Sequence, residues 1–347
     1  MRETALLAMV WLMGCGGAAR EAARPAGPEP EPVEEAEVAA PPEEDLAPRA
    51  WLYRVTGGGA PSPSYLLGTM HIGITFRAAV PSPLDSTLID ARTVVMEIDM
   101  REATRFFQEA PRTRTPRRQW LDRALPAETF ARLSAELARM APPEMIRQIP
   151  AGALANYLLQ VRMAEVEAVE DGRTPIAGAT SSARLDRSIF NWAIASGVPF
   201  VALETTEEGL AAFAGGEPAA AVEALRAMVD DAEGARAQAR RLRDAYRSLD
   251  EAQLLAVLAE MPEDQHQRVF HVRNAAWMRN LLPALEGGGA FVAVGAGHLV
   301  GEGSVIELLR AQGYQVERVL GDGGLTPSER TGVLIASRGS SIDAVAR

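Results

Sequence analysis

Short apolar runs predict strands near both ends of the folded part of this chain. The apolar segments Trp51 to Val55 and Tyr65 to Leu67, separated by the turn-like stretch Thr56 to Pro63, predict a hairpin. Apolar runs bounded by polar residues predict four further strands, at Thr93 to Ile98, Val198 to Leu203, Ala290 to Val294 and Tyr314 to Leu320. Most of the expected strands therefore lie near the two ends of the domain.

Leucine, isoleucine, valine and methionine recur at helical spacing between these strands. Helices are predicted over 85–91, 127–140, 143–170, 183–195, nearly all of 206–283, and about 302–312. Breaks in the long helical stretch are expected near Gly215-Gly216 and Met261-Pro262. The pattern predicts an α/β fold with a mixed central sheet flanked by helices, and a long helical insertion between the opening and closing strands.

The first fifteen residues have the features of an export signal. Arg2 precedes the apolar run Ala5 to Met13, and Leu12-Met13-Gly14-Cys15 is similar to a bacterial lipobox, which predicts cleavage before Cys15. Two acyl chains on that thiol would anchor the protein to a lipid bilayer on the exported side of the cell envelope. The alternative is an uncleaved apolar start with a chance cysteine. No later run of about 20 apolar residues could span a membrane.

Residues 16–48 consist mainly of alanine, proline and glutamate, a composition that predicts a disordered linker. The folded domain is expected over 49–322, followed by a loosely ordered tail over 323–347. The formal net charge is −11, much of it in the linker. Because nucleic-acid binding needs a concentrated positive surface, this balance argues against a nucleic-acid partner.

Two matching motifs carry histidines, Gly68-Thr-Met-His71 and Gly295-Ala-Gly-His298. Each follows an apolar strand, and we expect each glycine to let the backbone turn so that the histidine reaches the ligand-binding crevice. Taken singly, a histidine in such a position is more often a hydrogen-bonded structural residue. The other two histidines, His266 and His271, lie five residues apart in a helical stretch, and this spacing predicts that they face different sides.

Two glutamates have an equivalent placement, because Glu97 and Glu204 each end an apolar strand. Carboxylates in such positions can complete a metal site together with histidine nitrogens, or act as a general base. The alternative is a structural role, as a helix cap or as the partner of one of the many arginines.

Taken together, these motifs resemble the TraB/GumN family, whose relatives include the TIKI membrane-tethered proteases. The resemblance covers about residues 50 to 320 and rests on matching elements in the same order. The elements are the two histidine motifs, Val94-Val95-Met96-Glu97, Leu185-Asp186, Leu203-Glu204-Thr205 and Arg273-Asn274.

The resemblance implies a metal-dependent, peptidase-like site in which His71, Glu97 and His298 hold a divalent manganese, cobalt or zinc ion. A water molecule at the open position of such an ion would attack a peptide or protein substrate in the cell envelope. Gly68, Asp186 and Gly295 would support the ligands.

Three further residues are assigned catalytic roles. Glu204 could accept a proton, Arg273 could bind a substrate carboxylate or a developing oxyanion, and Asn274 could donate to the same oxygen. The structural alternative for Arg273 is a salt bridge to Asp186 or Glu204.

Two other functions fit the same residues. One is a metal-independent, esterase-like hydrolase in which a histidine acts as general base together with Glu97. The other is a non-catalytic binding or scaffold lipoprotein, which two imidazoles more than about 10 Å apart would favour.

Overall fold

The computed structural model describes residues 47–71, 73–109, 116–179, 184–214 and 216–328. The predicted signal peptide, Cys15, almost all of the linker and most of the predicted tail lie outside the described residues. Among the helices of the described ranges, none has the length and apolar character needed to cross a bilayer.

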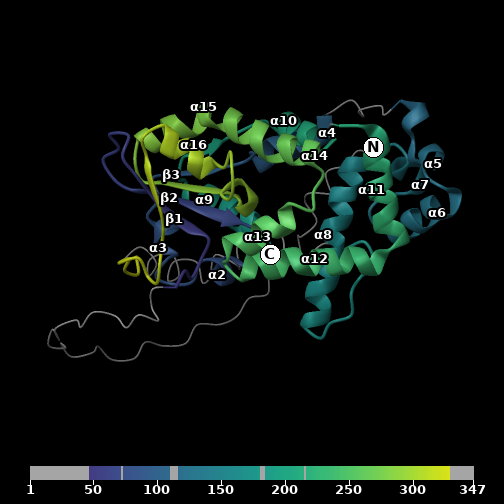
Figure 1. The fold of residues 1–347 in the computed structure, drawn as a ribbon, viewed down its shortest axis with the longest axis horizontal. Helices are drawn as coiled ribbons and strands as arrows, with labels where there is room; N and C mark the ends of the chain where they lie inside the picture. Colours follow the sequence, from purple (N-terminus) through teal and green to yellow (C-terminus); the bar gives the residue numbers. More distant parts are fainter. Residues whose placement is uncertain (1–46, 72, 110–115, 180–183, 215, 329–347) are drawn as a thin grey trace.

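A six-stranded sheet forms one end of the molecule (Figure 1). Its strands are β1 (Leu52–Thr56), β2 (Ser64–Thr69), β3 (Thr93–Met96), β4 (Phe200–Ala202), β5 (Ala290–Gly295) and β6 (Gln315–Arg318), in the order β4-β3-β5-β2-β1-β6. The first two strands form the expected antiparallel hairpin, and β6 also pairs antiparallel with β1. The four strands from β4 to β2 run parallel. The predicted mixed α/β sheet is therefore confirmed.

The parallel pairing brings separate segments of sequence to one edge of the sheet. Met96 pairs with Ala202 on one side and Ala293 on the other, and Thr69 pairs with Gly295. Residues that follow β2, β3, β4 and β5 consequently meet at the carboxyl edge, which is where ligands bind in parallel α/β sheets.

Helices surround the sheet and fill the long insertion. Before β4 they are α2 (Phe76–Ala79), α3 (Ser86–Ile89), α4 (Met100–Glu109), α5 (Leu121–Ala124), α6 (Ala127–Glu136), α7 (Pro143–Ile146), α8 (Ala151–Glu170) and α9 (Leu185–Ser196). After it come α10 (Thr206–Ala214), α11 (Pro218–Asp230), α12 (Ala232–Arg247), α13 (Glu251–Leu258), α14 (Glu263–His266), α15 (Arg273–Glu286) and α16 (Val305–Ala311). Two 3₁₀ turns cover Arg117–Gln119 and Ala296–His298.

The helical insertion has more breaks than its periodicity predicts. The helix expected over 143–170 is interrupted after Ile146, and α8 starts directly after Pro150. The stretch 206–283 is also broken at Asp231 and Asp250, whose side chains accept hydrogen bonds from the first turns of α12 and α13. Capping groups of this kind end one helix and start the next without changing the apolar period.

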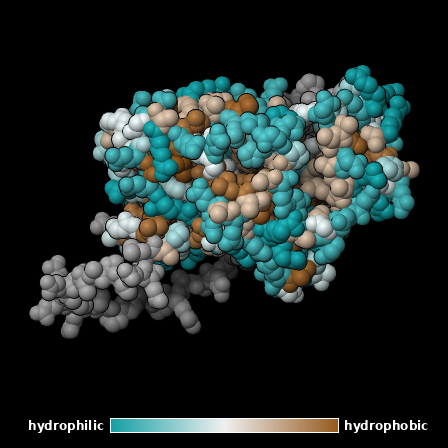
Figure 2. All heavy atoms as spheres, viewed as in Figure 1, coloured by the Kyte–Doolittle hydropathy of each residue, from teal (hydrophilic) through white to brown (hydrophobic). Residues whose placement is uncertain are grey.

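The residues that the structure describes form two apolar cores. One packs both faces of the sheet, and the other lies within the helical lobe formed by α5, α6, α7, α8 and α11 at the opposite end (Figure 1). Arg162 of α8 is 2% exposed and joins Glu136 of α6 to Glu165, so a buried ion-pair cluster also holds this lobe. The face of the molecule shown in Figure 2 is mainly hydrophilic, with hydrophobic side chains in small groups.

The expectation that His266 and His271 face different sides is wrong. Residues Gln267–Val272 form a π-helix, in which residues five apart lie one above the other. The two imidazole rings are consequently 5.2 Å apart between centroids, and His266 also packs on Phe270. This short segment leads directly into Arg273 at the start of α15.

Candidate functional site

Close packing explains the first motif glycine, Gly68. A Cβ atom on Gly68 would lie 3.0 Å from Trp51 Cβ and 3.1 Å from Ala296 Cα. Gly295 has a φ of −52°, which any residue can adopt, and Gly68 likewise has no left-handed backbone. Gly68 therefore lets β2 and the turn that carries His298 approach each other, and neither glycine supplies the tight turn that the sequence suggested.

His71 is paired with Asp186 at the first turn of α9. Its Nδ1 atom lies 2.6 Å from Asp186 Oδ2, and an isolated parallel bridge between Ile74 and Arg184 ties the loop after His71 to the start of that helix. Burial alone would lower the pKa of His71, but the Asp186 carboxylate outweighs it and raises the pKa to about 9. Because Nδ1 is engaged, Nε2 is the nitrogen left to meet a ligand.

His298 is 3% exposed and is held in one orientation. Its Nδ1 atom lies 2.6 Å from Asn274 Oδ1, and the Asn274 amide nitrogen donates to the Gly303 carbonyl. This network assigns the proton to Nδ1 and leaves Nε2 as an acceptor, 3.2 Å from an Arg273 nitrogen. Burial lowers the pKa of His298 to about 3, so the ring is neutral.

Arg273 joins the two glutamates. One terminal nitrogen donates to Glu97 Oε2 at 2.7 Å and to Glu204 Oε1 at 2.6 Å, and Nε donates to both oxygens of Glu204 at 3.1 Å. The indole N–H of Trp277 also donates to Glu204 at 2.9 Å. Of the two partners considered for Arg273, the structure thus selects Glu204 over Asp186, and it adds Glu97.

Glu97 is fixed from two directions, because its second oxygen accepts the Gly295 N–H at 2.7 Å. Burial would raise the pKa of Glu97, but the charge of Arg273, followed by the two histidines, holds that pKa well below its usual value. The carboxylate is therefore ionised throughout the physiological range.

The three expected metal ligands surround one point. A Cβ atom on Gly295 would lie 3.4 Å from Glu97 Oε1, 3.5 Å from His298 Cδ2 and 3.7 Å from His71 Nε2. The two imidazoles are thus close together, and the separation above about 10 Å that would favour a scaffold role is not found. The absent side chain of Gly295 leaves the room between them.

The donor set fits a divalent cation in its chemistry. In both histidines the Nδ1 atom lies next to an oxygen acceptor. This arrangement is usual for an imidazole that binds a metal through Nε2, because the hydrogen bond at Nδ1 fixes the ring. The described residues nevertheless contain no group of three or more histidine, cysteine or acidic side chains already arranged to hold a metal. The Arg273 guanidinium instead contacts two of the expected ligands, Glu97 and His298 Nε2.

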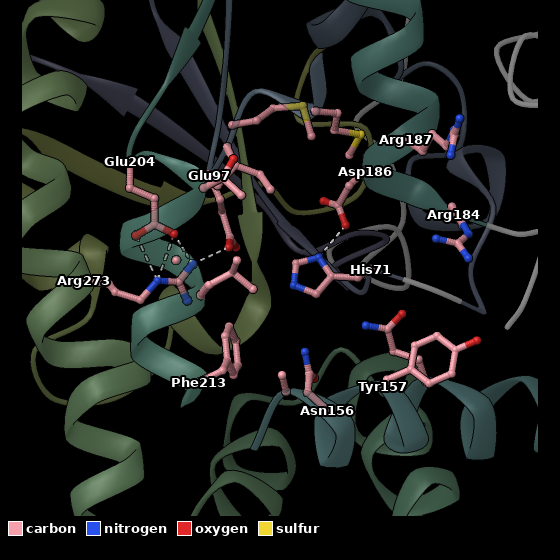
Figure 3. Close-up of a pocket in the computed structure, with 18 of the residues that line it drawn as sticks. His71, Glu97, Asn156, Tyr157, Arg184, Asp186, Arg187, Glu204, Phe213 and Arg273 are labelled. Atoms are coloured by element: carbon pink, nitrogen blue, oxygen red, sulfur yellow. Dashed lines mark hydrogen bonds and ion pairs between the residues drawn. The ribbon is translucent and has the colours of Figure 1, made fainter. Parts of the chain in front are cut away.

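A cavity of about 220 Å³ lies in front of these residues (Figure 3). His71, Glu97, Asp186, Glu204 and Arg273 line it, whereas Asn274 and His298 do not. The apolar part of its wall includes Met96, Ile98, Leu154, Leu210 and Phe213.

Six polar residues of the wall were not foreseen. They are Asn156, Tyr157 and Gln160 of α8, Arg184 and Arg187 at the start of α9, and Thr206 at the start of α10. Asn156 and Gln160 are four residues apart, a spacing that indicates one shared helix face, but such polar positions look like ordinary solvated helix surface.

The site defines an α/β protein with two histidines, two glutamates and an arginine clustered at the carboxyl edge of parallel strands. The family model described as TraB/PrgY/gumN family matches residues 51–318. The chain belongs to this family. No curated protein and no solved structure matches it.

Proposed function

We propose that the protein is a metal-dependent hydrolase, with a peptidase-like site, acting in the cell envelope. The observation that carries the proposal is the convergence of His71 Nε2, Glu97 Oε1 and the His298 ring on the point beside Gly295. An imidazole pair and a carboxylate are a ligand set that keeps a coordination position open for water or substrate.

His71, Glu97 and His298 would hold the cation, with Asp186 and Asn274 fixing the two rings. A divalent cation bound there supplies a positive charge that polarises a carbonyl group and acidifies water. For a cation to bind His298, Arg273 must lose its contact with His298 Nε2. Arg273 can still donate to both oxygens of Glu204.

The remaining residues act through charge and orientation. Arg273 lines the cavity and is placed to stabilise negative charge on a substrate oxygen. Glu204 was expected to accept a proton, but Arg273 and Trp277 donate to both of its oxygens, an arrangement that favours holding Arg273. Asn274 lies behind His298 and supports that ring rather than a substrate. Hydrolysis adds water across an amide bond, yielding a carboxylate and an amine.

Metal binding by matched variants tests the proposal. Titration calorimetry with Mn²⁺ or Zn²⁺ should give at least tenfold weaker binding for His71→Ala, His298→Ala and Gly295→Ala than for the wild type. A methyl group at 295 makes only ordinary contacts, so Gly295→Ala should fold while filling the space between the ligands. Gly287→Ala is the control, because Gly287 follows the last residue of α15, has a φ of −67°, and a Cβ atom there would meet only the Ala284 carbonyl oxygen at 3.6 Å. Unchanged metal binding in both histidine variants would refute the metal site.

A metal-independent hydrolase is the second candidate, favoured by the His71–Asp186 pair at 2.6 Å and by the guanidinium beside Glu97. In this candidate the histidine is paired with Asp186, whereas the sequence suggested a pairing with Glu97. With a pKa of about 9, His71 carries a proton on Nε2 at neutral pH, and this proton must leave before the nitrogen can act as a base or bind a cation, so the pKa does not distinguish the two candidates. Activity that survives a strong chelator would favour it. A protein with neither metal binding nor hydrolysis would be the scaffold lipoprotein.

The lipid anchor at Cys15 is part of the same proposal and rests on the lipobox-like sequence. Radiolabelled palmitate should enter the wild-type protein and leave Cys15→Ser unlabelled, and the variant should leave the membrane fraction. Equal labelling of both proteins would refute the anchor.

A further inference from the structure

Apolar side chains make up most of the wall of the cavity in front of the candidate reactive residues. They come from three parts of the chain: Met96 and Ile98 at the end of β3, Met140, Ile149 and Leu154 in the helical lobe, and Leu210 and Phe213 in α10. Figure 3 shows Phe213 and Asn156 on one side of the open space, and Glu97 and Asp186 on the other. A ligand group that covers this apolar wall removes it from water, which is favourable.

The character of the wall favours an uncharged group over a charged one. The charged groups of the candidate site are engaged with one another, because Asp186 contacts His71, and Arg273 donates to both glutamates. The Arg273 guanidinium also lies over the Phe213 ring, 5.6 Å from its centroid. A charged side chain that packed against Leu210 and Phe213 would lose hydration to carbon atoms, whereas an apolar side chain would gain free energy there.

The size of the cavity suits one large side chain. Its volume is about 220 Å³. Apolar cavities of about 150 Å³ take up a benzene ring, so a leucine, methionine or phenylalanine side chain fits. Sites for drug-sized ligands start at roughly 300 Å³, which is larger than this cavity. One bulky side chain is therefore a better match than a long apolar ligand.

Two amide side chains in the same wall favour a peptide as the carrier of that apolar group. Asn156 and Gln160 of α8 are four residues apart, so they share one face of the helix, and both line the cavity. A primary amide has a donor and an acceptor, which match the carbonyl and the N–H of a peptide unit. An acyl chain offers neither group along its length.

We propose that the cavity binds one bulky, uncharged apolar side chain of a peptide, and that the protein selects its substrates by this residue. The peptide bond beside His71 and Glu97 is then one that adjoins the apolar residue. Water added across that bond yields a carboxylate and an amine. The cleavage step rests on the proposed function, whereas the binding preference can be measured without any reaction.

The test compares blocked tripeptides on the full-length protein with a chelator present, so that no metal-dependent turnover occurs. The probes are acetyl-Ala-Leu-Ala-amide, acetyl-Ala-Ala-Ala-amide and acetyl-Ala-Asp-Ala-amide, which differ only in the middle side chain. By titration calorimetry the leucine peptide should bind at least tenfold more tightly than the other two, because even one methylene in an apolar pocket can change affinity about tenfold. Equal affinities, or no binding of the leucine peptide, would overturn the proposal.

Variants assign the preference to the cavity. Ala153 lines the wall, so Ala153→Leu places a side chain of the protein in the space, and the leucine and alanine peptides should then bind within about twofold of each other. Ala224→Leu, at an exposed position of α11, is the matched control and should keep the wild-type preference. If Ala153→Leu does not fold, Leu210→Asn puts a polar group in the same wall and should weaken the preference at least threefold. An undiminished preference in the folded wall variant would overturn the assignment.

Three further outcomes separate this inference from the proposed function. Octanamide binding as tightly as the leucine peptide would mean that the cavity takes acyl chains, and would overturn the inference. With Mn²⁺ added, cleavage of the leucine and aspartate peptides at equal rates would remove the selectivity and leave the hydrolase standing. Preferential binding of the leucine peptide without cleavage would refute the hydrolase and support the cavity assignment.

Discussion

The two histidines of the site differ in whether a nearby charge outweighs their burial. Burial lowers the pKa of both rings, but the Asp186 carboxylate outweighs it at His71, whereas at His298 burial dominates over the Glu97 charge. The pKa values consequently move in opposite directions, to about 9 for His71 and about 3 for His298. One site therefore contains a charged imidazole and a neutral one at pH 7.

Replacing the partner of His71 should change its charge state. In Asp186→Asn the pKa of His71 should fall from about 9 towards about 6.5, the ordinary value for histidine. NMR titration of the imidazole Cε1–H signal in metal-free protein measures this. Asp122→Asn, which alters an acid of α5 paired with Arg147, is the control and should leave the titration unchanged. An unshifted pKa in Asp186→Asn would show that the carboxylate is not the cause.

A methyl group on Gly68 should destabilise the protein, because the new atom meets the backbone at Ala296, which cannot rotate away. We expect Gly68→Ala to lose about 1 to 3 kcal/mol of unfolding free energy, as in other overpacked sites. Denaturant unfolding followed by circular dichroism measures the loss. Gly287→Ala, with only an Ala284 oxygen at 3.6 Å, should change stability little. Equal stability of both variants would contradict the close-packing explanation.

At the scale of elements, helices far along the chain fix the ends of the strands. The side chains of Arg273, Asn274 and Trp277 lie on one face of α15, because positions three and four apart share a side. They reach Glu97, Glu204 and His298, which follow three different strands. From the other side, Tyr246 of α12 donates to the Gly68 carbonyl at 3.0 Å.

The Tyr246 contact can be tested without changing packing. Tyr246→Phe removes one hydroxyl and leaves the Gly68 carbonyl, which is buried, without that donor. We expect a loss of about 1 kcal/mol in unfolding free energy. Tyr65→Phe, on the same strand as Gly68, is the matched control and should be nearly neutral. If the two variants are equally stable, the hydroxyl of Tyr246 does not secure β2.

At the scale of the whole molecule, the two histidines make stability depend on pH in opposite ways. The raised pKa of His71 gives stability that is fully present below about 6.5 and is lost as pH rises through about 9. The lowered pKa of His298 gives stability that is present above about 6.5 and is lost as pH falls through about 3. Stability should be greatest between these limits.

The expected loss of stability on the alkaline side of this profile is due to His71. Unfolding free energies of metal-free wild type and His71→Gln, measured in urea at pH 6, 7.5 and 9.5, should converge as pH rises. The difference between the two proteins is the quantity to follow, because other groups titrate equally in both. A difference that stays constant across this range would mean that the His71–Asp186 interaction does not contribute to stability.

Local patterns in the sequence determined the mixed α/β class, the hairpin, the strands that precede Glu97, Glu204 and His298, and the family. These follow from apolar periodicity and motif order, which depend on near neighbours. The apolar pattern did not predict the helix boundaries at Asp231 and Asp250, because a capping side chain ends a helix without altering the spacing of apolar residues. The apolar pattern also did not predict the π-helix of residues 267–272, because the pattern assumes the period of an α-helix.

Only the tertiary structure decided which partner each polar group takes. The sequence offered Asp186 and Glu204 as alternatives for Arg273, and the fold gives Asp186 to His71 and both glutamates to Arg273. The fold also shows that Gly68 allows a close approach of two backbone segments, whereas the sequence suggested a tight turn. It places Arg184 and Arg187 in the cavity wall. The physical reason is that ion pairs and packing can join residues more than a hundred positions apart, such as His71 and Asp186. At that separation, the spacing in the sequence does not indicate the distance in space.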